Sequence, residues 1–284
     1  MKRKLAALIT CLMIFISQVM TTSYAGVYDG YVRDRASLNA DNVSEKNYKI
    51  FSPDLSEDTE VIETKKDLAD EAAKTYESVF IDEAHFPSDG FRNLVSENFD
   101  TDGDGTLSSD EIREAKIVNS EGDYEIDSLK GIEYLANLKK LNVYSDTLSE
   151  VNITKNPELQ ILSLSGDGAI TSIDTSRNAK LRVFNVTNSS LESVDLTKNP
   201  ELRIFTVPLT SLRSVDLRNN PYLKRCEVPG TQVKELDVTH NKRLQALNVE
   251  NTSVSKVDTS NNRDLYEFYF NSTPISSVDF SKNW

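Results

Sequence analysis

Residues 202–220, LRIFTVPLTSLRSVDLRNN, decide the fold of this chain. The run from Leu202 through Phe205 to Val207 alternates apolar and polar residues, as a short strand with one buried side does. Another apolar residue, Leu212, follows ten positions after the leading leucine, and the segment ends with V-D-x-x-x-N at Asn220. The segment therefore predicts one strand and a compact return.

The same pattern recurs throughout the C-terminal half of the chain. Units begin at Leu138, Leu159, Leu181, Leu202, Leu223, Leu244 and Leu265. The asparagines that close the units are 21 residues apart, or 22 at the first step: Asn156, Asn178, Asn199, Asn220, Asn241, Asn262 and Asn283. Five positions of each unit are apolar in every copy, if Cys226 is counted. Self-similarity at this period indicates a solenoid.

This repeat predicts an α+β solenoid of the leucine-rich-repeat class, with short parallel strands and 21-residue units. A unit of 21 residues leaves no room for a long helix on the return path, so we expect tight turns there. No unit can bury its apolar edge alone, and the end units need caps. A degenerate first unit uses the apolar residues Ile117, Ile126, Leu129 and Ile132.

Ahead of the repeats, residues 100–111 read DTDGDGTLSSDE. The spacing fits a twelve-residue EF-hand loop, with acids at positions 1, 3 and 5, glycine at 6 and glutamate at 12. The predicted ligands are Asp100, Asp102, Asp104, the Thr106 carbonyl, Ser108 through a water, and Glu111. Calcium is favoured over magnesium, because many oxygens and a bidentate glutamate suit the larger cation. An Asp/Gly-rich turn without a metal is the alternative.

The residues around this loop predict helices on both sides. Ser88 is a candidate N-cap for a helix that carries Phe91, Leu94 and Phe99 at helical spacing, and a short helix follows the loop. We therefore predict an EF-hand helix–loop–helix cap over residues 79–116, ahead of a solenoid over 117–284.

The N-terminal region predicts secretion. Residues 1–25 combine a basic start, an apolar run and Ser23-Tyr24-Ala25, which is typical of a secretory signal peptide. A membrane anchor is the alternative, but the apolar run is shorter than the roughly 20 residues that span a bilayer. Residues 26–78 are acidic and lack apolar periodicity, so we interpret them as a flexible linker, with a small folded module as the alternative. The expected location is extracellular, in solution or at a cell surface.

Two further features of the repeats admit a structural and a functional interpretation. An aspartate precedes each closing asparagine by four residues, as Asp216 does for Asn220. Such a row could bind calcium ions, or its side chains could bond to turn backbone groups, and we favour the second interpretation. Cys226 takes an inward position, which predicts a buried, inert thiol rather than a nucleophile.

The face of the sheet that points away from the core is the predicted partner surface. Ile161, Val183 and Ile204 form an apolar stripe there, and Arg225 continues their row. The adjacent row contributes the other predicted contacts: Asn185, Thr206 and Tyr269. We expect this concave face to bind an extracellular protein or peptide, and the chain to be a monomer. A plain surface without a partner is the alternative, because short aliphatic residues on a sheet need none.

Composition excludes other classes of function. The net charge of −13 argues against nucleic acid, whose phosphates need a basic face. No segment after the N-terminus predicts a membrane span. His85 and His240 belong to no catalytic constellation, so we predict a non-enzymatic protein. A dockerin-like, calcium-dependent assembly adapter is the alternative, although such adapters use two loops and one is present here.

The quoted motifs together resemble a known group of proteins. Phe86-Pro-Ser-Asp-Gly-Phe91, the acidic loop, the run LKGIEYL at 129–135 and the repeats resemble secreted leucine-rich-repeat proteins of Gram-positive bacteria, many from gut communities, that carry an EF-hand. The repeats are similar to those of the internalins. The resemblance covers residues 79–284, and it implies calcium binding in the loop and partner binding on the concave face.

Overall fold

The chain divides into two units, Met1–Arg33 and Asp34–Trp284. The computed structural model describes residues 38–39, 47–49, 58, 60–62, 64, 74–120, 124–166 and 168–283, all in the second unit. The predicted signal peptide and most of the predicted linker lie outside the described residues. No helix in the described part of the chain combines the length and the apolar character needed to cross a membrane.

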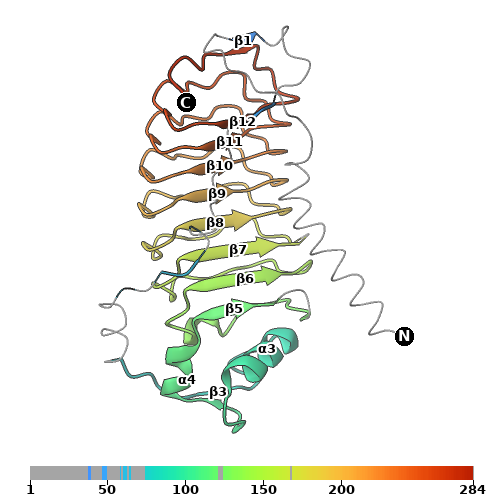
Figure 1. The fold of residues 1–284 in the computed structure, drawn as a ribbon. Coiled ribbons are helices and arrows are strands. Elements are labelled where there is room, and N and C mark those ends of the chain that lie inside the picture. Colours follow the sequence, from blue (N-terminus) through green and yellow to red (C-terminus); the bar gives the residue numbers. More distant parts are fainter. Residues whose placement is uncertain are drawn as a thin grey trace. The chain divides into compact units, whose positions relative to one another are not determined.

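One nine-stranded sheet forms the spine of the second unit (Figure 1). Eight strands run parallel and follow one another in chain order: β5 (Ile117–Asn119), β6 (Lys140–Tyr144), β7 (Ile161–Ser165), β8 (Val183–Val186), β9 (Ile204–Thr206), β10 (Arg225–Glu227), β11 (Ala246–Asn248) and β12 (Glu267–Tyr269). Equivalent repeat positions pair, since Phe205 lies between Phe184 and Cys226 in the register. The predicted parallel-strand solenoid is confirmed.

The core is one continuous cluster that passes through every coil. Most of the five predicted inward positions are fully buried, and Val194 and Val215 are only partly buried. A sixth inward position lies two residues beyond the fifth, and it was not predicted because its residues are mixed in character. Its buried members are Ile153, Thr175, Leu196, Leu217, Val238 and Thr259.

The closing asparagines are buried, and their amides join successive coils. In each coil the Nδ2 group donates to two backbone carbonyls of preceding coils. Asn220, for example, donates to the carbonyls of Leu196 at 3.1 Å and Asn199 at 2.8 Å. These carbonyls face inward, where water cannot reach them, so the asparagine supplies the partner that each would otherwise lack.

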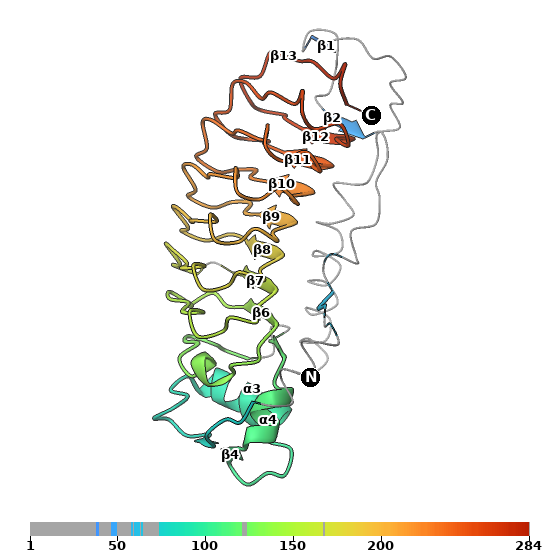
Figure 2. The ribbon, with the colours of Figure 1, turned by 90° about the vertical axis from the view of Figure 1, so that its left-hand side faces the viewer.

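Turn residues complete the coil on the side away from the sheet (Figure 2). Each aspartate of the row accepts a hydrogen bond from the backbone N–H two residues later, as Asp195 does from Thr197 at 2.9 Å. This confirms the interpretation as turn residues. Threonines such as Thr231 donate to the carbonyl three residues earlier, at 2.7 Å.

Another column of turn residues has positive φ in five successive coils: Asn188, Leu209, Gly230, Asn251 and Ser272, at 50° to 68°. Glycine and asparagine tolerate this conformation, whereas leucine is strained in it. Leu209 is also largely exposed, so packing does not explain its presence there.

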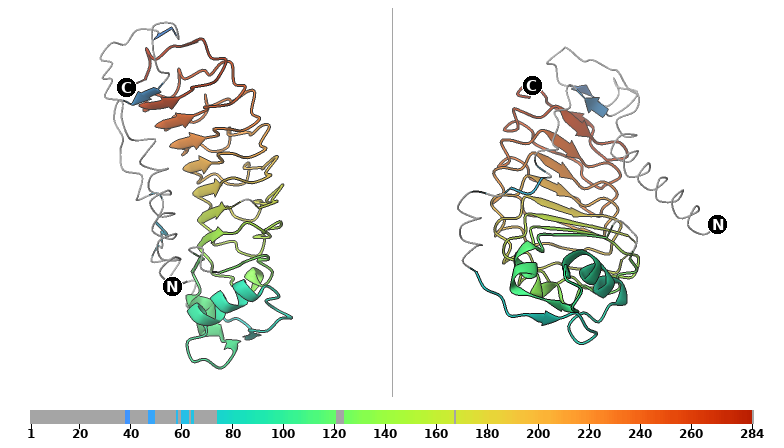
Figure 3. Two further views of the ribbon diagram at one scale, coloured as in Figure 1. Left: turned by 90° about the vertical axis from the view of Figure 1, so that its right-hand side faces the viewer. Right: turned by 60° about the horizontal axis from the view of Figure 1, so that its bottom comes forward.

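Both ends of the sheet are covered. At the β5 end lie α3 (Asp89–Phe99) and α4 (Ser109–Glu114), whose apolar residues join the core cluster (Figure 3). They and the short 3-10 helix η3 (Ile132–Tyr134) are the helices of residues 74–120, 124–166 and 168–283. At the other end, β2 (Asn47–Lys49) pairs antiparallel with β12, and β1 (Leu38–Asn39) pairs with β13 (Ser277–Val278).

The pairing of β1 and β2 places residues 38–39 and 47–49 in strands, within the range 26–78 that the sequence predicts to be a flexible linker. For these described residues, backbone hydrogen bonding to the last coils replaces the disorder that their composition predicted. An unpaired edge strand exposes a row of N–H and C=O groups, and β2 covers that row on β12.

Asn220→Ala tests the contribution of the asparagine amides. The substitution leaves two buried carbonyls unpaired, so we expect the free energy of unfolding to fall by about 3 kcal/mol. Urea unfolding followed by circular dichroism measures it. The neighbouring Asn219 is exposed, and Asn219→Ala is expected to change stability by less than about 0.5 kcal/mol. Equal losses in the two variants would contradict this role of the amide.

Candidate functional site

The acidic loop is held between two capped helices and a strand pair. Ser88 is the N-cap of α3, and its side chain accepts from the N–H of Phe91, as predicted. Ser108 caps α4 in a reciprocal capping box with Glu111. Within the loop, β4 (Thr106–Leu107) pairs antiparallel with β3 (Val79–Phe80), and Leu107 is fully buried. The loop is therefore fixed at both ends and in the middle.

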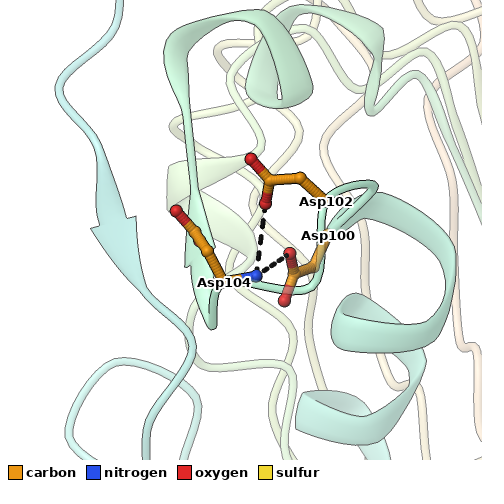
Figure 4. A group of neighbouring side chains, drawn as sticks. All are labelled: Asp100, Asp102 and Asp104. Atoms are coloured by element: carbon orange, nitrogen blue, oxygen red, sulfur yellow. Dashed lines mark hydrogen bonds between the residues drawn. The ribbon is translucent and has the colours of Figure 1, made fainter.

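Three aspartates of this loop converge on one point (Figure 4). Asp100, Asp102 and Asp104 each offer a carboxylate oxygen, and these oxygens lie within 4.8 Å of one another. Backbone N–H groups hold Asp100 in place, because Gly103 and Gly105 donate to its two oxygens at 2.8 and 3.0 Å. The backbone of the loop itself thus fixes the Asp100 carboxylate.

Both glycines of the loop have positive φ, 73° for Gly103 and 79° for Gly105. A side chain at either position would force an L residue into a conformation that it rarely adopts. The sharp turn that brings the three carboxylates together therefore depends on the D-G-D-G sequence.

Glu111, the predicted ligand at position 12, does not belong to the group of three. It is 7% exposed, and its Oε1 accepts from the Thr101 N–H at 2.6 Å while its Oε2 accepts from the Ser108 N–H at 2.9 Å. Burial alone would raise the pKa of this carboxyl, but the hydrogen bonds from Ser108 and Thr101 outweigh it and lower the pKa to about 2. In this arrangement Glu111 joins the two ends of the loop.

The donor set suits a hard divalent cation. Three carboxylates supply oxygen ligands only, and the Thr106 carbonyl and Ser108 follow at the predicted positions of the loop. Mutual repulsion of three carboxylates at this distance favours a cation between them.

The predicted partner stripe is not open to solvent. Ile161, Val183 and Ile204 are only 3%, 5% and 7% exposed, and they form an apolar cluster with Val61 packed against it. The expectation that these residues are exposed is therefore wrong. A segment that the sequence interpretation treated as linker covers them.

A row of cations beside the stripe holds this segment through Asp58. Arg203 Nη1 and Lys224 Nζ donate to the two carboxylate oxygens of Asp58, at 2.7 and 2.5 Å. Arg182 Nη2 lies 3.6 Å from the same carboxylate. Burial would raise the pKa of Asp58, yet the hydrogen bonds from Lys224 and Arg203 keep it below its usual value.

Sequence interpretation missed these residues. Arg182, Arg203 and Lys224 each stand directly before a strand, at intervals of 21 residues, and that periodic basic row was the available signal. Nothing comparable marked Asp58, because one acid in an acidic stretch has no distinguishing pattern.

The other predicted partner residues lie on the same face of the sheet. Asn185, Thr206, Arg225 and Tyr269 are partly exposed. Arg225 contacts Glu227 within its strand and Glu267 of β12 at 3.6 Å. On β10–β12 the partly exposed residues include Arg225 and Tyr269, whereas Ala246 and Glu267 are buried.

The surroundings of Cys226 and of the two histidines indicate structural roles. The Cys226 thiol is fully buried, and burial raises its pKa, so the reactive thiolate does not form at neutral pH. His85 and His240 each face an aspartate three residues earlier, at 2.7 Å from Asp82 and 3.8 Å from Asp237. Both are local turn contacts.

Known structures show the same fold. The functional domain of InlJ from Listeria monocytogenes, which includes a cysteine ladder, is 23% identical with a TM-score of 0.58, and the match covers 72% of this chain and 50% of that one. An internalin C2 from Listeria monocytogenes is 16% identical with a TM-score of 0.65, covering 73% and 94%. These likenesses show the internalin-type leucine-rich-repeat fold.

The chain spans about half the length of the InlJ structure that it matches. Its described residues contain one free cysteine, Cys226, and so no cysteine ladder. No protein-family model matches the chain, and no curated protein matches it.

Glu111→Gln tests how this carboxylate stabilises the loop. In chelator at pH 7, loss of its charged hydrogen bonds is expected to lower the free energy of unfolding by about 1–3 kcal/mol. Because the folded pKa is depressed, to about 2, this stabilisation is present above the unfolded pKa and disappears as the pH falls through the folded one. Thermal unfolding of both proteins between about pH 7 and 2 measures it.

The matched control is Glu114→Gln, since the side chain of Glu114 is 73% exposed on the same helix. This variant is expected to follow the wild type at every pH. If wild type and Glu111→Gln differ in stability by the same amount at about pH 7 and at about pH 2, the charged Glu111 carboxylate is not the source of the stabilisation.

Proposed function

We propose that this chain is a secreted, non-enzymatic leucine-rich-repeat protein that binds an extracellular protein or peptide on the outward face of its sheet, the face that points away from the core. One observation supports this most. The inward positions repeat nearly the same residues in every coil, whereas the outward positions of the strands change from coil to coil. The first outward row reads Ile161, Val183, Ile204, Arg225, Ala246 and Glu267. The fold requires the inward pattern, but it does not require this outward variety.

Two partly exposed residues of β10 and β12, Arg225 and Tyr269, are candidate partner contacts on this face. Arg225 and Tyr269 are of the residue types that contribute most to protein interfaces. Neighbouring acids hold the Arg225 guanidinium in place, so it is ordered before a partner arrives.

Calcium in the 100–111 loop is the second part of the proposal. Asp100, Asp102 and Asp104 would hold the ion with the Thr106 carbonyl, and Glu111 would join them by leaving its contacts with Thr101 and Ser108. Bound calcium supplies positive charge that offsets the repulsion between the carboxylates. Its role is structural, because the loop is part of the cap over the β5 end.

Variants of the face test partner binding. Immobilised full-length chain is exposed to extracts of secreted and cell-surface proteins, and captured proteins are quantified by mass spectrometry. Arg225→Ala and Tyr269→Ala are expected to reduce specific capture at least tenfold, since truncating a central interface residue costs about 2 kcal/mol. Arg213→Ala is the control, because its side chain is 61% exposed and pairs with Glu192 away from the strands. Equal capture by all variants would contradict a binding face there.

Calcium is tested by thermal unfolding with the ion or with chelator. With a dissociation constant of ~10 μM, 1 mM calcium adds about 2.7 kcal/mol. Asp104→Asn is expected to remove most of this gain, while Asp110→Asn, an exposed loop residue that is not a predicted ligand, retains it. Equal unfolding temperatures with calcium and with chelator would contradict the site. If folded Asp104→Asn loses partner capture while Arg225→Ala and Tyr269→Ala retain it, the alternative function, a dockerin-like calcium-dependent assembly adapter, would be favoured.

A further inference from the structure

We infer that the β7–β10 part of the outward face recognises an acidic peptide that carries an aliphatic residue three positions after a carboxylate, and that the chain's own covering segment occupies this surface. The covering segment is Asp58 together with residues 60–62. The inference rests on the proposed binding function, and it adds the chemistry of the ligand and the state of the surface.

A cationic subsite binds the carboxylate. Arg182, Arg203 and Lys224 come from three successive coils and meet at Asp58, whose side chain is 3% exposed. Without this carboxylate, three cations on neighbouring rungs would repel one another. Arg182 is itself buried, and its Nε and Nη2 atoms make no hydrogen bond. A buried cation of this kind is strongly destabilising when it lacks a counter-charge, so the subsite favours an acidic occupant.

A second subsite binds backbone. Gln160 accepts from the Ile62 N–H at 2.7 Å and donates to the Ile62 carbonyl at 2.5 Å. Arg182 Nη1 donates to the Glu60 carbonyl at 2.8 Å. These side chains form hydrogen bonds with main-chain groups, which any peptide of the same conformation offers.

A third subsite is apolar. Val61 packs on Ile161, Val183 and Ile204, which belong to three adjacent strands. The Ile62 side chain is 42% exposed and adds little to the contact. One carboxylate, one aliphatic side chain, two carbonyls and one N–H group therefore define the pattern that the surface selects.

Attachment to the same chain gives the covering segment an advantage over a free peptide. A tethered ligand acts at an effective concentration that reaches millimolar values. A free ligand binds only the fraction of molecules whose surface is open, so its apparent affinity falls by that fraction. Weakening the segment's own contacts should therefore increase the affinity for a peptide added in solution.

The experiment uses the full-length chain and a fluorescent peptide with the sequence of residues 55–65, LSEDTEVIETK. Fluorescence anisotropy measures its dissociation constant with wild type, Asp58→Asn and Val61→Asp. Both variants open the surface, by different contacts, and each is expected to bind the peptide at least tenfold more tightly than wild type. Arg203→Glu added to Asp58→Asn is expected to abolish the gain. A peptide that carries asparagine in place of Asp58 is likewise expected to show no tighter binding to the two variants than to wild type.

Circular dichroism confirms that the variants are folded, and the two single variants remove different contacts, so one of them suffices if the other unfolds. Equal peptide affinity for wild type and both variants, or no binding by any of them, overturns the inference. A concentration-dependent dimer of wild type that Asp58→Asn dissociates would also overturn it, because the segment would then occupy the face of a second copy. The proposed function is tested separately. If one of these results is found but Arg225 and Tyr269 are still needed to capture a protein partner, the inference fails and the proposed function remains.

Discussion

Every coil of this solenoid turns backbone carbonyls toward its interior, and the coil alone has no donors for them. The buried asparagine of the following coil supplies two hydrogen bonds, and the next asparagine does the same one step further on. An uncompensated carbonyl in an apolar interior costs free energy comparable to a lost hydrogen bond. An insertion in one coil must therefore leave the amide in reach of the same carbonyls. The one longer unit, between Asn156 and Asn178, keeps its asparagine bonded to the Asn156 carbonyl.

Much of the solenoid could be predicted because its interior is repetitive. Apolar positions such as Phe205 and Leu247 are fixed by strand alternation, and repetition over seven units removes ambiguity that one unit would leave. The sixth inward position escaped prediction for a physical reason. Thr175 and Thr259 fill it in two coils, and their hydroxyls donate to Asn199 and Asn283, so a polar residue is satisfied where periodicity leads one to expect an apolar one.

The site was predictable to different depths. Local spacing placed Asp100, Asp102 and Asp104 around one point, because a twelve-residue loop with its glycines leaves the backbone few choices. Glu111 shows the limit of spacing, since its carboxylate bonds to Thr101 and Ser108 in this structure. The covered stripe was beyond local reasoning altogether. Val61 packs against the cluster that begins with Ile161, 100 residues later in the chain, and a single valine in an acidic stretch carries no periodic signal.

The pairing of β2 with β12 has a kinetic implication. Tyr48 and Phe268 stand opposite one another although about 220 residues separate them. Contacts of such high sequence separation form late and slow folding, because a long loop must close before the contact is gained. Parallel coils can assemble one upon another as the chain emerges, but the strand that seals the far edge must wait for the final rung. A newly made molecule therefore passes through a stage in which the last rung is stacked but unsealed and open to pairing with a neighbouring chain.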